Sequence, residues 1–249
     1  MKRIGVVLTT YQRFSRFKEC FEHLIANSRD VEEIVIVDDC SKLDRDKYDK
    51  YFETILPSNI HVFVNTENFG VGISKNRGIK YFYDKGYDYI FTLEDDINVV
   101  NPNVFIKYIE MSEQTGFQYI NFALHGPLNK GHKQVFNING LEVAIYPHIV
   151  GAFSLHTKKL IDEIGFYDEK FVNAWEHVDY CYQAAKKELT TPFWMFVDLI
   201  NSDSYLFEQN FSIDDSSIRT RPDWADNIGK GAVYFHKKNG VSISDIPRQ

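Results

Sequence analysis

One stretch decides the fold of this chain: Tyr89-Ile90-Phe91-Thr92-Leu93-Glu94-Asp95-Asp96-Ile97. Its apolar first half predicts a strand with both faces covered, as in a parallel sheet. The three carboxylates then fall at the carboxyl end of that strand, the edge where open α/β sheets bind ligands. Because adjacent acids repel one another, they need a cation or a polar ligand to compensate them. Oxygen ligands at such an edge suit Mg²⁺ or Mn²⁺ shared with substrate phosphates.

Strands and helices alternate over the first hundred residues. Short apolar runs predict the strands, and apolar residues at helical spacing predict the helices. The expected strands are Ile4–Leu8, Glu33–Asp39, Ile60–Asn65 and Tyr89–Leu93, and the expected helices are Phe14–Asn27 and Ile73–Asp84. This rhythm predicts right-handed βαβ units, and therefore an α/β fold with a mostly parallel central sheet flanked by helices.

The rhythm changes after residue 100. We expect helices over 103–115, 157–165 and 176–188, and short mixed strands around 119–124 and 134–146. The tail from Asp198 is rich in Ser, Asp and Asn, which predicts loops. Since the chain has no internal repeat and no low-complexity linker, we expect one domain over 1–249. Its first half (1–100) would bind a nucleotide and its second, mixed half (101–249) an acceptor.

Composition excludes several classes of partner. A net charge of −7 argues against a nucleic-acid binder, and no apolar stretch approaches the ~18 residues of a transmembrane segment. The short apolar run at the N-terminus gives way at once to polar residues, which predicts a first strand rather than a signal peptide. Cys20, Cys40 and Cys181 lie far apart and are expected to be reduced thiols. We therefore expect a cytoplasmic protein, lying at the membrane surface if its acceptor is membrane-bound.

Four polar clusters fall where the predicted strands end. They are Thr9-Thr10-Tyr11, Asp38-Asp39-Cys40-Ser41, the loop and helix start Asn68–Gly78, and Glu94-Asp95-Asp96. Gly70 and Gly72 allow close backbone approach, while Lys75 and Arg77 can neutralise phosphate charge. The glycines form neither a dinucleotide fingerprint nor a P-loop. Acids for a base, a ribose and a metal, beside a basic helix turn, suit a nucleotide diphosphate.

Taken in this order, the segments resemble the nucleotide-sugar glycosyltransferases of the GT-A fold, family 2 in particular. The matching stretches are Val6–Arg13, Ile36–Ser41, Asn68–Gly78, Phe91–Ile97, Gly151–Ser154, Ile164–Glu169 and Trp175–Asp179, within about residues 4–185. The resemblance implies transfer of a sugar from a nucleotide diphosphate sugar to a hydroxyl of a glycan or glycoconjugate. Inversion at the anomeric carbon, a UDP-sugar donor and assistance by Mn²⁺ or Mg²⁺ are expected.

The resemblance also implies roles for matched residues. Asp39 is expected to contact the nucleobase with Thr9 and Tyr11 nearby, and Asp95 to contact the ribose or phosphate. Asp96 is expected to bind the metal together with His236, which stands where related enzymes place a C-terminal metal-binding histidine. The remaining residues expected to bind the nucleotide sugar are Arg13, Asp38, Asn68, Gly70, Lys75, Arg77 and Glu94.

The chain departs from the family pattern at the base. Glu176-His177 stands where relatives usually carry Glu-Asp, so either residue could take the proton from the acceptor hydroxyl. We favour Glu176, because a carboxylate also stabilises a developing oxocarbenium ion and partial burial beside Trp175 would help it. Asp179, one helical turn further on, is expected to orient the base or bind the acceptor.

Two alternatives stay open. A sugar-1-phosphate nucleotidyltransferase would carry a glycine-rich basic loop after the first strand, which Thr9-Thr10-Tyr11-Gln12 does not provide. A non-catalytic carbohydrate-binding protein could keep this fold after losing activity, as the altered base position allows. The intact metal carboxylates favour the enzyme.

Overall fold

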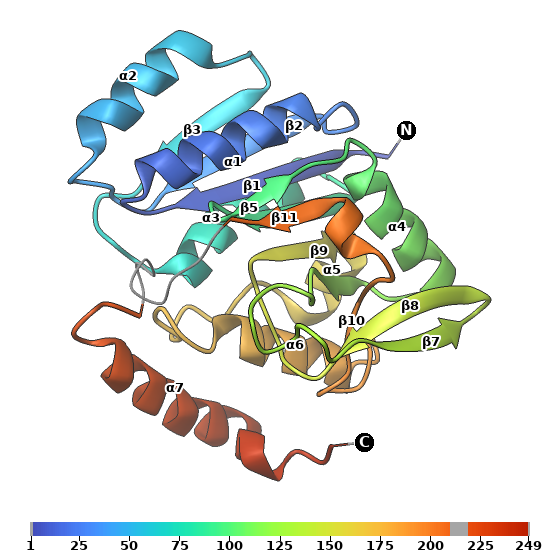
Figure 1. The fold of residues 1–249 in the computed structure, drawn as a ribbon. Coiled ribbons are helices and arrows are strands. Elements are labelled where there is room, and N and C mark those ends of the chain that lie inside the picture. The colour runs from blue at the N-terminus through green and yellow to red at the C-terminus, as the bar shows by residue number, and fades with distance from the viewer. Residues whose placement is uncertain (1, 210–218, 249) are drawn as a thin grey trace.

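A six-stranded sheet forms the centre of the protein, whose computed structural model describes residues 2–209 and 219–248 (Figure 1). The strand order is β3-β2-β1-β4-β9-β6. Strands β1 to β4 run parallel, and β9 lies antiparallel between β4 and β6. The bounds are β1 Ile4–Thr10, β2 Glu33–Asp38, β3 Ile60–Val64, β4 Tyr89–Glu94, β6 Tyr119–Asn121 and β9 Phe153–Thr157. The expected mostly parallel α/β sheet is confirmed.

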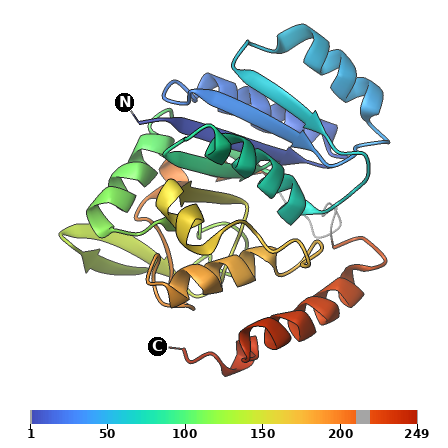
Figure 2. The same cartoon turned by 180° about the vertical axis from the view of Figure 1, so that it is seen from behind.

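Helices cover both faces of this sheet (Figures 1 and 2). Successive residues of β1 point to opposite faces, so Leu8 joins the core cluster of Phe17 from α1, while Val7 joins that of Ile79 from α3. Helices α1, α2 and α4 contribute to the first cluster, and α3, α5 and α6 to the second. The bounds are α1 Phe14–Ala26, α2 Arg45–Ile55, α3 Val71–Asp84, α4 Val104–Thr115, α5 Lys158–Ile164 and α6 Glu176–Lys186.

Helix α3 packs unusually close to the sheet, and Gly78 makes this possible. A Cβ atom at Gly78 would lie 2.3 Å from Val7 Cγ1, a distance that real Cβ atoms do not show. At the start of the same helix, Gly70 has a φ of 96°, which L side chains rarely adopt. Gly70 thus allows the turn that starts α3, and Gly78 allows the middle of the helix to pack closely on β1.

Two smaller sheets complete the second half. Strands β10 (Phe196–Leu199), β8 (Leu141–Tyr146) and β7 (Gln134–Ile138) form one antiparallel sheet. Strand β11 (Leu206–Glu208) pairs antiparallel with β5 (Ile97–Val99), so that Glu208 lies opposite Ile97. This pairing brings a segment from the C-terminal part of the chain directly beside the acids that end β4.

One helix was not predicted, and one expectation about the elements fails. Helix α2 was not predicted, because its sequence is mostly charged and only Tyr48 and Tyr51 are buried among its described side chains. The tail was expected to form loops, yet α7 (Trp224–Asn239) is a helix of 16 residues. Its own sequence carries only a narrow apolar stripe, since Gly231 and Phe235 are its buried residues. Tertiary contact with Trp175 holds it in place: the indole ring covers Gly231, and Trp175 Nε1 donates to Ile228 O at 3.0 Å.

Candidate active site

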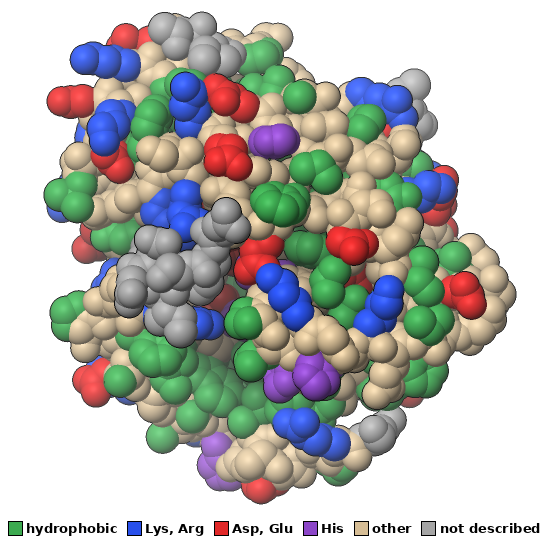
Figure 3. Space-filling model, viewed as in Figure 1, with side chains coloured by type: hydrophobic (Ala, Val, Ile, Leu, Met, Phe, Trp, Pro, Cys, Tyr) green, Lys and Arg blue, Asp and Glu red, His purple; other side chains and the backbone are tan. Residues whose placement is uncertain are grey.

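Two adjoining hollows open at the carboxyl edge of the parallel strands. The smaller, which we call the small pocket, encloses about 50 Å³ and is lined by Thr9, Tyr11, Asp39, Asn68 and Arg221 among others. The larger, which we call the main cleft, encloses about 590 Å³ and extends past Asp96 to Glu176 and His177. Both share the walls Arg13, Val71, Glu94 and Asn173. Figure 3 shows a hollow on this face, with hydrophobic side chains below it and histidines beside it.

Asp39 organises the loop that walls the small pocket. Its Oδ1 accepts hydrogen bonds from Asn65 Nδ2 and Phe69 N at 2.8 and 2.9 Å. Its Oδ2 accepts from Asn68 Nδ2 and Gly70 N at 2.9 and 2.8 Å. The carboxylate therefore already has four donors, and its first effect is to hold the loop that leads into α3. Thr9, Tyr11 and Asn68 lie beside it in the same pocket, as the sequence placed them.

Asp38 has a different role from its neighbour. Its side chain is fully buried, Oδ1 accepts from Ser41 N at 2.9 Å, and Oδ2 pairs with Arg45 Nη1 at 2.7 Å. Both oxygens thus stabilise the turn after β2 and the start of α2. The structure separates the two adjacent acids, because Asp38 ends the strand and faces α2 while Asp39 lines the small pocket.

Glu94, in the wall that both hollows share, forms an ion pair with Lys75 in which the carboxylate stays partly exposed. Lys75 is fully buried, and its Nζ donates to Glu94 Oε1 at 2.6 Å and to Gly151 O at 2.7 Å. Burial raises the pKa of Glu94, but the charge and hydrogen bond of Lys75 outweigh it and lower the pKa. Lys75, which the sequence suggested as a phosphate contact, is used inside the protein to keep Glu94 ionised.

Arg77 does not join the phosphate-binding group that the sequence suggested. Its Nη1 donates to Val64 O at 2.9 Å and to Asn65 Oδ1 at 2.7 Å, and its guanidinium lies 4.9 Å from the ring of Phe63. It lines a third hollow, of about 380 Å³, over α3 and β3. Lys75 and Arg77 are two residues apart, so on a helix they point in nearly opposite directions.

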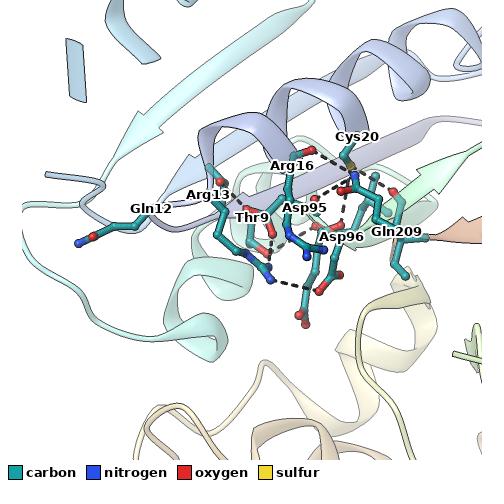
Figure 4. A network of polar contacts seen from close by, with 12 residues as sticks. Thr9, Gln12, Arg13, Arg16, Cys20, Asp95, Asp96 and Gln209 are labelled. Atoms are coloured by element: carbon teal, nitrogen blue, oxygen red, sulfur yellow. Dashed lines mark hydrogen bonds and ion pairs between the residues drawn. The ribbon is translucent and has the colours of Figure 1, made fainter. Parts of the chain in front are cut away.

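Arg13 supplies the positive charge that the acids meet in the cleft (Figure 4). Its guanidinium forms an ion pair with Asp95 Oδ1 and a longer contact, 3.3 Å, with Asp96 Oδ2. Asp95 Oδ2 also accepts a hydrogen bond from Thr10 Oγ1 at 2.6 Å. Burial raises the pKa of Asp95 to about 6, although Arg13 opposes this shift.

Glu176 and His177 lie together at the start of α6 and line the main cleft. His177 Nδ1 is 2.9 Å from Glu176 Oε1, while Glu176 Oε2 is buried and has no hydrogen-bond partner among the described residues. We expected burial to favour this carboxylate as a base by raising its pKa. Burial does act in that direction, but the charges of His177 and Lys75 and the His177 hydrogen bond lower the pKa to about 2.

Trp175 occupies a strained position directly before Glu176. It has a φ of 72° in the left-handed region, which for a bulky residue costs about 1–3 kcal/mol. Such strain often marks functional sites, where the surrounding structure enforces it. Asp179, by contrast, faces away from the cleft towards α7: Oδ2 pairs with Lys238 Nζ at 2.7 Å and Oδ1 accepts from Asn239 Nδ2 at 3.1 Å. Its expected contact with the acceptor therefore gives way to a role in anchoring α7.

The structure does not bring His236 to the acids. His236 is exposed in the last turn of α7, where its Nδ1 lies 3.2 Å from Ser242 Oγ. Within residues 2–209 and 219–248, no group of three or more His, Cys, Asp or Glu side chains is arranged to hold a metal. One observation nevertheless fits a cation: Asp96 Oδ1 is buried without a hydrogen-bond partner in the described chain, and Asp96 lines the main cleft.

Several residues of the site gave no signal in the sequence. Arg221 reaches the small pocket from the C-terminal segment, and its Nη1 donates to Asn68 Oδ1 at 2.9 Å. Glu208 and His125 line the main cleft, with Glu208 Oε1 3.5 Å from His125 Nδ1. The pairing of β11 with β5 brings Glu208 there. Because such contacts join segments far apart in the chain, periodicity and motif spacing could not reveal them.

Comparison with known proteins agrees with this architecture. The family model of glycosyl transferase family 2 matches residues 5–160. A relative from Haloferax volcanii, the low-salt glycan biosynthesis hexosyltransferase Agl10, is 21% identical over 235 residues, covering 84% of this chain and 71% of the relative. Among solved structures, S. aureus TarS 1–349 in complex with UDP-GlcNAc superposes with a TM-score of 0.58 at 12% identity, covering 98% of this chain and 74% of that chain. The mannosyltransferase PcManGT from Pyrobaculum calidifontis, in complex with GDP-Man and Mn²⁺, gives a TM-score of 0.54 at 12% identity, covering 80% and 55%.

The chain belongs to glycosyl transferase family 2, and its fold is the GT-A fold of the glycosyltransferases that it superposes on. The family and the fold that the sequence motifs implied are thus confirmed. In the part of the chain that the structure describes, no helix is both long and apolar enough to span a bilayer.

Proposed function

We propose that the protein transfers a hexose from a nucleotide diphosphate sugar to an acceptor hydroxyl with inversion, and that a divalent cation assists. One catalytic domain over 1–249 would supply both halves of the site. The observation that carries the proposal is the buried Glu176, whose Oε2 is unpartnered among described residues and lies in the cleft that Glu94 and Asp96 also line. Relatives named as a hexosyltransferase and as structures with UDP-GlcNAc or GDP-Man support a nucleotide-sugar donor.

The donor would lie across both hollows. The small pocket, with Tyr11 and Asp39 in its wall, would receive only the edge of the nucleobase, because about 50 Å³ is too small for a whole nucleoside. A UDP-sugar is the donor that we favour. Arg13 borders both hollows and would meet the diphosphate, while the sugar would extend into the main cleft. Arg221 would close the nucleoside side, since it already bonds to Asn68 there.

Asp96 is the residue best placed to hold Mn²⁺ or Mg²⁺. Its unpartnered Oδ1 would give one oxygen ligand, and the donor diphosphate would give others, as is usual for these hard cations. When bound, such a cation would act as a Lewis acid on the leaving diphosphate. Asp95 is already saturated by Arg13 and Thr10, so its role would be to fix Arg13 near the diphosphate.

Glu176 would act as the base. The acceptor hydroxyl gives its proton to Glu176 Oε2 while its oxygen bonds to the anomeric carbon. The bond from that carbon to the diphosphate oxygen breaks, and its electron pair leaves with the diphosphate. Glu176 is ionised at neutral pH, so no prior proton loss is needed, but the lowered pKa makes it a weaker base than an ordinary glutamate while His177 and Lys75 hold it. His177 would hold the carboxylate through Oε1, so that Oε2 faces the acceptor, a glycan or glycoconjugate in the main cleft.

Thermal unfolding with nucleotide diphosphates tests donor binding. We expect UDP with Mn²⁺ to raise the midpoint most, because a UDP-sugar is the donor that we favour. A ligand present at a hundred times its Kd stabilises the native state by about 2.7 kcal/mol. UDP-sugars that stabilise the protein are then incubated with glycan acceptors, and the anomeric configuration of the product is read by NMR. A product that retains the donor's configuration would contradict the single displacement. A nucleotide sugar that binds but is never turned over would favour the non-catalytic alternative.

A further inference from the structure

Arg13 stands where a bound cation would compensate the acids. Its guanidinium contacts both Asp95 and Asp96, and both acids are buried. The two contacts are unequal: the pair with Asp95 is tight, whereas Arg13 Nη1 lies 3.3 Å from Asp96 Oδ2. Arg13 Nε and Asp96 Oδ1 are buried without hydrogen-bond partners among the described residues. These three side chains belong to a larger polar network that also includes Arg16 and Gln209, and they leave one acceptor and one donor without a partner among the described residues (Figure 4).

The acids in this network are held on a rigid backbone. Gln209 N donates to Asp96 O at 2.9 Å, and Gln209 Nε2 bonds to Asn98 Oδ1 at 2.8 Å and to Asp95 O at 3.4 Å. Strand β11, which Gln209 follows, is itself paired with β5. By contrast, Arg13 is the N-cap of α1, and its long side chain borders both hollows. The side chain of Arg13 has more rotatable bonds than that of an aspartate, so Arg13 is the member of the network that would move when a ligand binds.

We propose that Arg13 is the resident counter-ion of Asp95 and Asp96, and that its charge opposes binding of a divalent cation at Asp96 until a diphosphate arrives. This inference rests on the proposed metal-assisted function and adds an order of events to it. With the cleft free of nucleotide, Arg13 satisfies the acids and the metal binds weakly. A diphosphate would supply oxygens for both cations, so Arg13 would contact the diphosphate and leave Asp96 to hold the metal.

The physical reason is repulsion between like charges at short range. A guanidinium and a divalent cation that share two carboxylates repel each other, and partial burial weakens the screening by water. Diphosphate oxygens placed between them convert this repulsion into attraction to a common anion. Metal and donor must then bind cooperatively, and by linkage each strengthens the other to the same extent. Such coupling would keep the site from holding a metal without its donor.

Mn²⁺ binding to the protein alone, without nucleotide, tests the proposal. Free Mn²⁺ is measured by electron paramagnetic resonance during titration of the wild type, Arg13→Gln, Arg13→Lys and Arg45→Gln. We expect Arg13→Gln to bind Mn²⁺ about tenfold more tightly than the wild type, because a neighbouring positive charge is removed. Arg13→Lys keeps that charge and should stay within about twofold of the wild type. Arg45→Gln is the matched control, because Arg45, the first residue of α2, pairs with buried Asp38 and does not line the main cleft.

Two results would overturn the proposal. One is equal Mn²⁺ affinity for Arg13→Gln and the wild type while turnover still requires Mn²⁺. The other concerns folding: if Arg13→Gln is unfolded without metal, millimolar Mn²⁺ should restore its circular dichroism, and failure to restore it contradicts the counter-ion role. A different outcome strikes the proposed function itself, namely that no variant binds Mn²⁺ even with UDP present and that turnover persists in excess chelator.

Discussion

Two of the buried aspartates, Asp95 and Asp198, differ in the partners that surround them. Burial raises the pKa of both Asp95, at the end of β4, and Asp198, in β10, to about 6. Asp198 accepts hydrogen bonds only from neutral groups, among them Tyr108 Oη at 2.6 Å and Ser202 Oγ at 2.8 Å. Asp95 instead pairs with the guanidinium of Arg13. In the main cleft beside it, Asp96 Oδ1 and Glu176 Oε2 have no hydrogen-bond partner among the described residues.

This difference distinguishes a candidate functional site from a hydrogen-bond network that only stabilises the fold. Asp198 ties together the first half of α4, the chain after β6 and the turn after β10, because Leu124 N at 3.2 Å and Leu199 N at 2.8 Å also donate to it. All of its acceptor capacity is used, so it stabilises the fold. The acids of the cleft keep free acceptor capacity that the fold itself does not need. Both places have a buried aspartate with a raised pKa. Only the acids of the main cleft have carboxylate oxygens without a hydrogen-bond partner among the described residues.

The largest effect should come from Glu176→Gln. This change keeps the shape but removes the base, so kcat should fall about a thousandfold, within the range for loss of general-base catalysis. Steady-state kinetics should show little change in donor KM. Asp198→Asn, the matched substitution in the hydrogen-bond network around Asp198, should keep a near wild-type kcat per folded molecule. An inactive His177→Ala together with an active Glu176→Gln would reverse the roles of the two residues.

Asp96→Ala should rank next. If Asp96 holds the metal, its loss should lower kcat by about a hundredfold or more, since metal catalysis is worth several kcal/mol. The free energy of unfolding should change by less than about 1 kcal/mol, because Asp96 makes no strong hydrogen bond within the described side chains. Rates measured with and without excess chelator check the fall in kcat, and denaturant unfolding checks the change in stability. Full wild-type activity in chelator would contradict the metal role.

Asp198→Ala should show the reverse profile. Removing this carboxylate leaves Tyr108 Oη, Ser202 Oγ and the bonded backbone N–H groups without an acceptor. This loss should lower the free energy of unfolding by about 3 kcal/mol. Activity per folded molecule should stay near wild type at a temperature well below the midpoint. Denaturant unfolding and active-site titration measure the two quantities. A stable Asp198→Ala protein with low kcat would erase the distinction between the two places.

The smallest effect should be in the pH dependence of stability. Since the folded pKa of Asp198 lies above the unfolded value, folding binds a proton there, and stability falls as pH rises through this range. Between pH 4.5 and 6.5 this group should remove about 2 kcal/mol, at roughly 1.4 kcal/mol per pKa unit. Asp198→Asn should flatten the wild-type curve by that amount. Glu176 acts oppositely, but its stabilisation is lost only as pH falls from about 4.5 towards 2. An unchanged slope in Asp198→Asn would contradict the raised pKa.

The tail shows where sequence interpretation failed and why. Its composition predicted loops, but Trp175 packs on Gly231, Lys238 bonds to Asp179, and a helix results. Helix propensity is a weak guide when contacts with distant segments supply the stability. The same segment delivers Arg221 to the small pocket.

The amino-acid sequence was sufficient to predict the alternating strands and helices of the first half and the sheet edge at which its acids gather. These follow from local periodicity and from the handedness of βαβ connections, which depend on neighbours in the chain. Tertiary structure alone decided which charges the fold consumes: Lys75 holds Glu94, Arg77 turns to β3, and Arg13 remains for the cleft. The physical reason is that a charge is free or satisfied only with respect to the groups that surround it in space. Those groups come from elements whose packing no local pattern specifies.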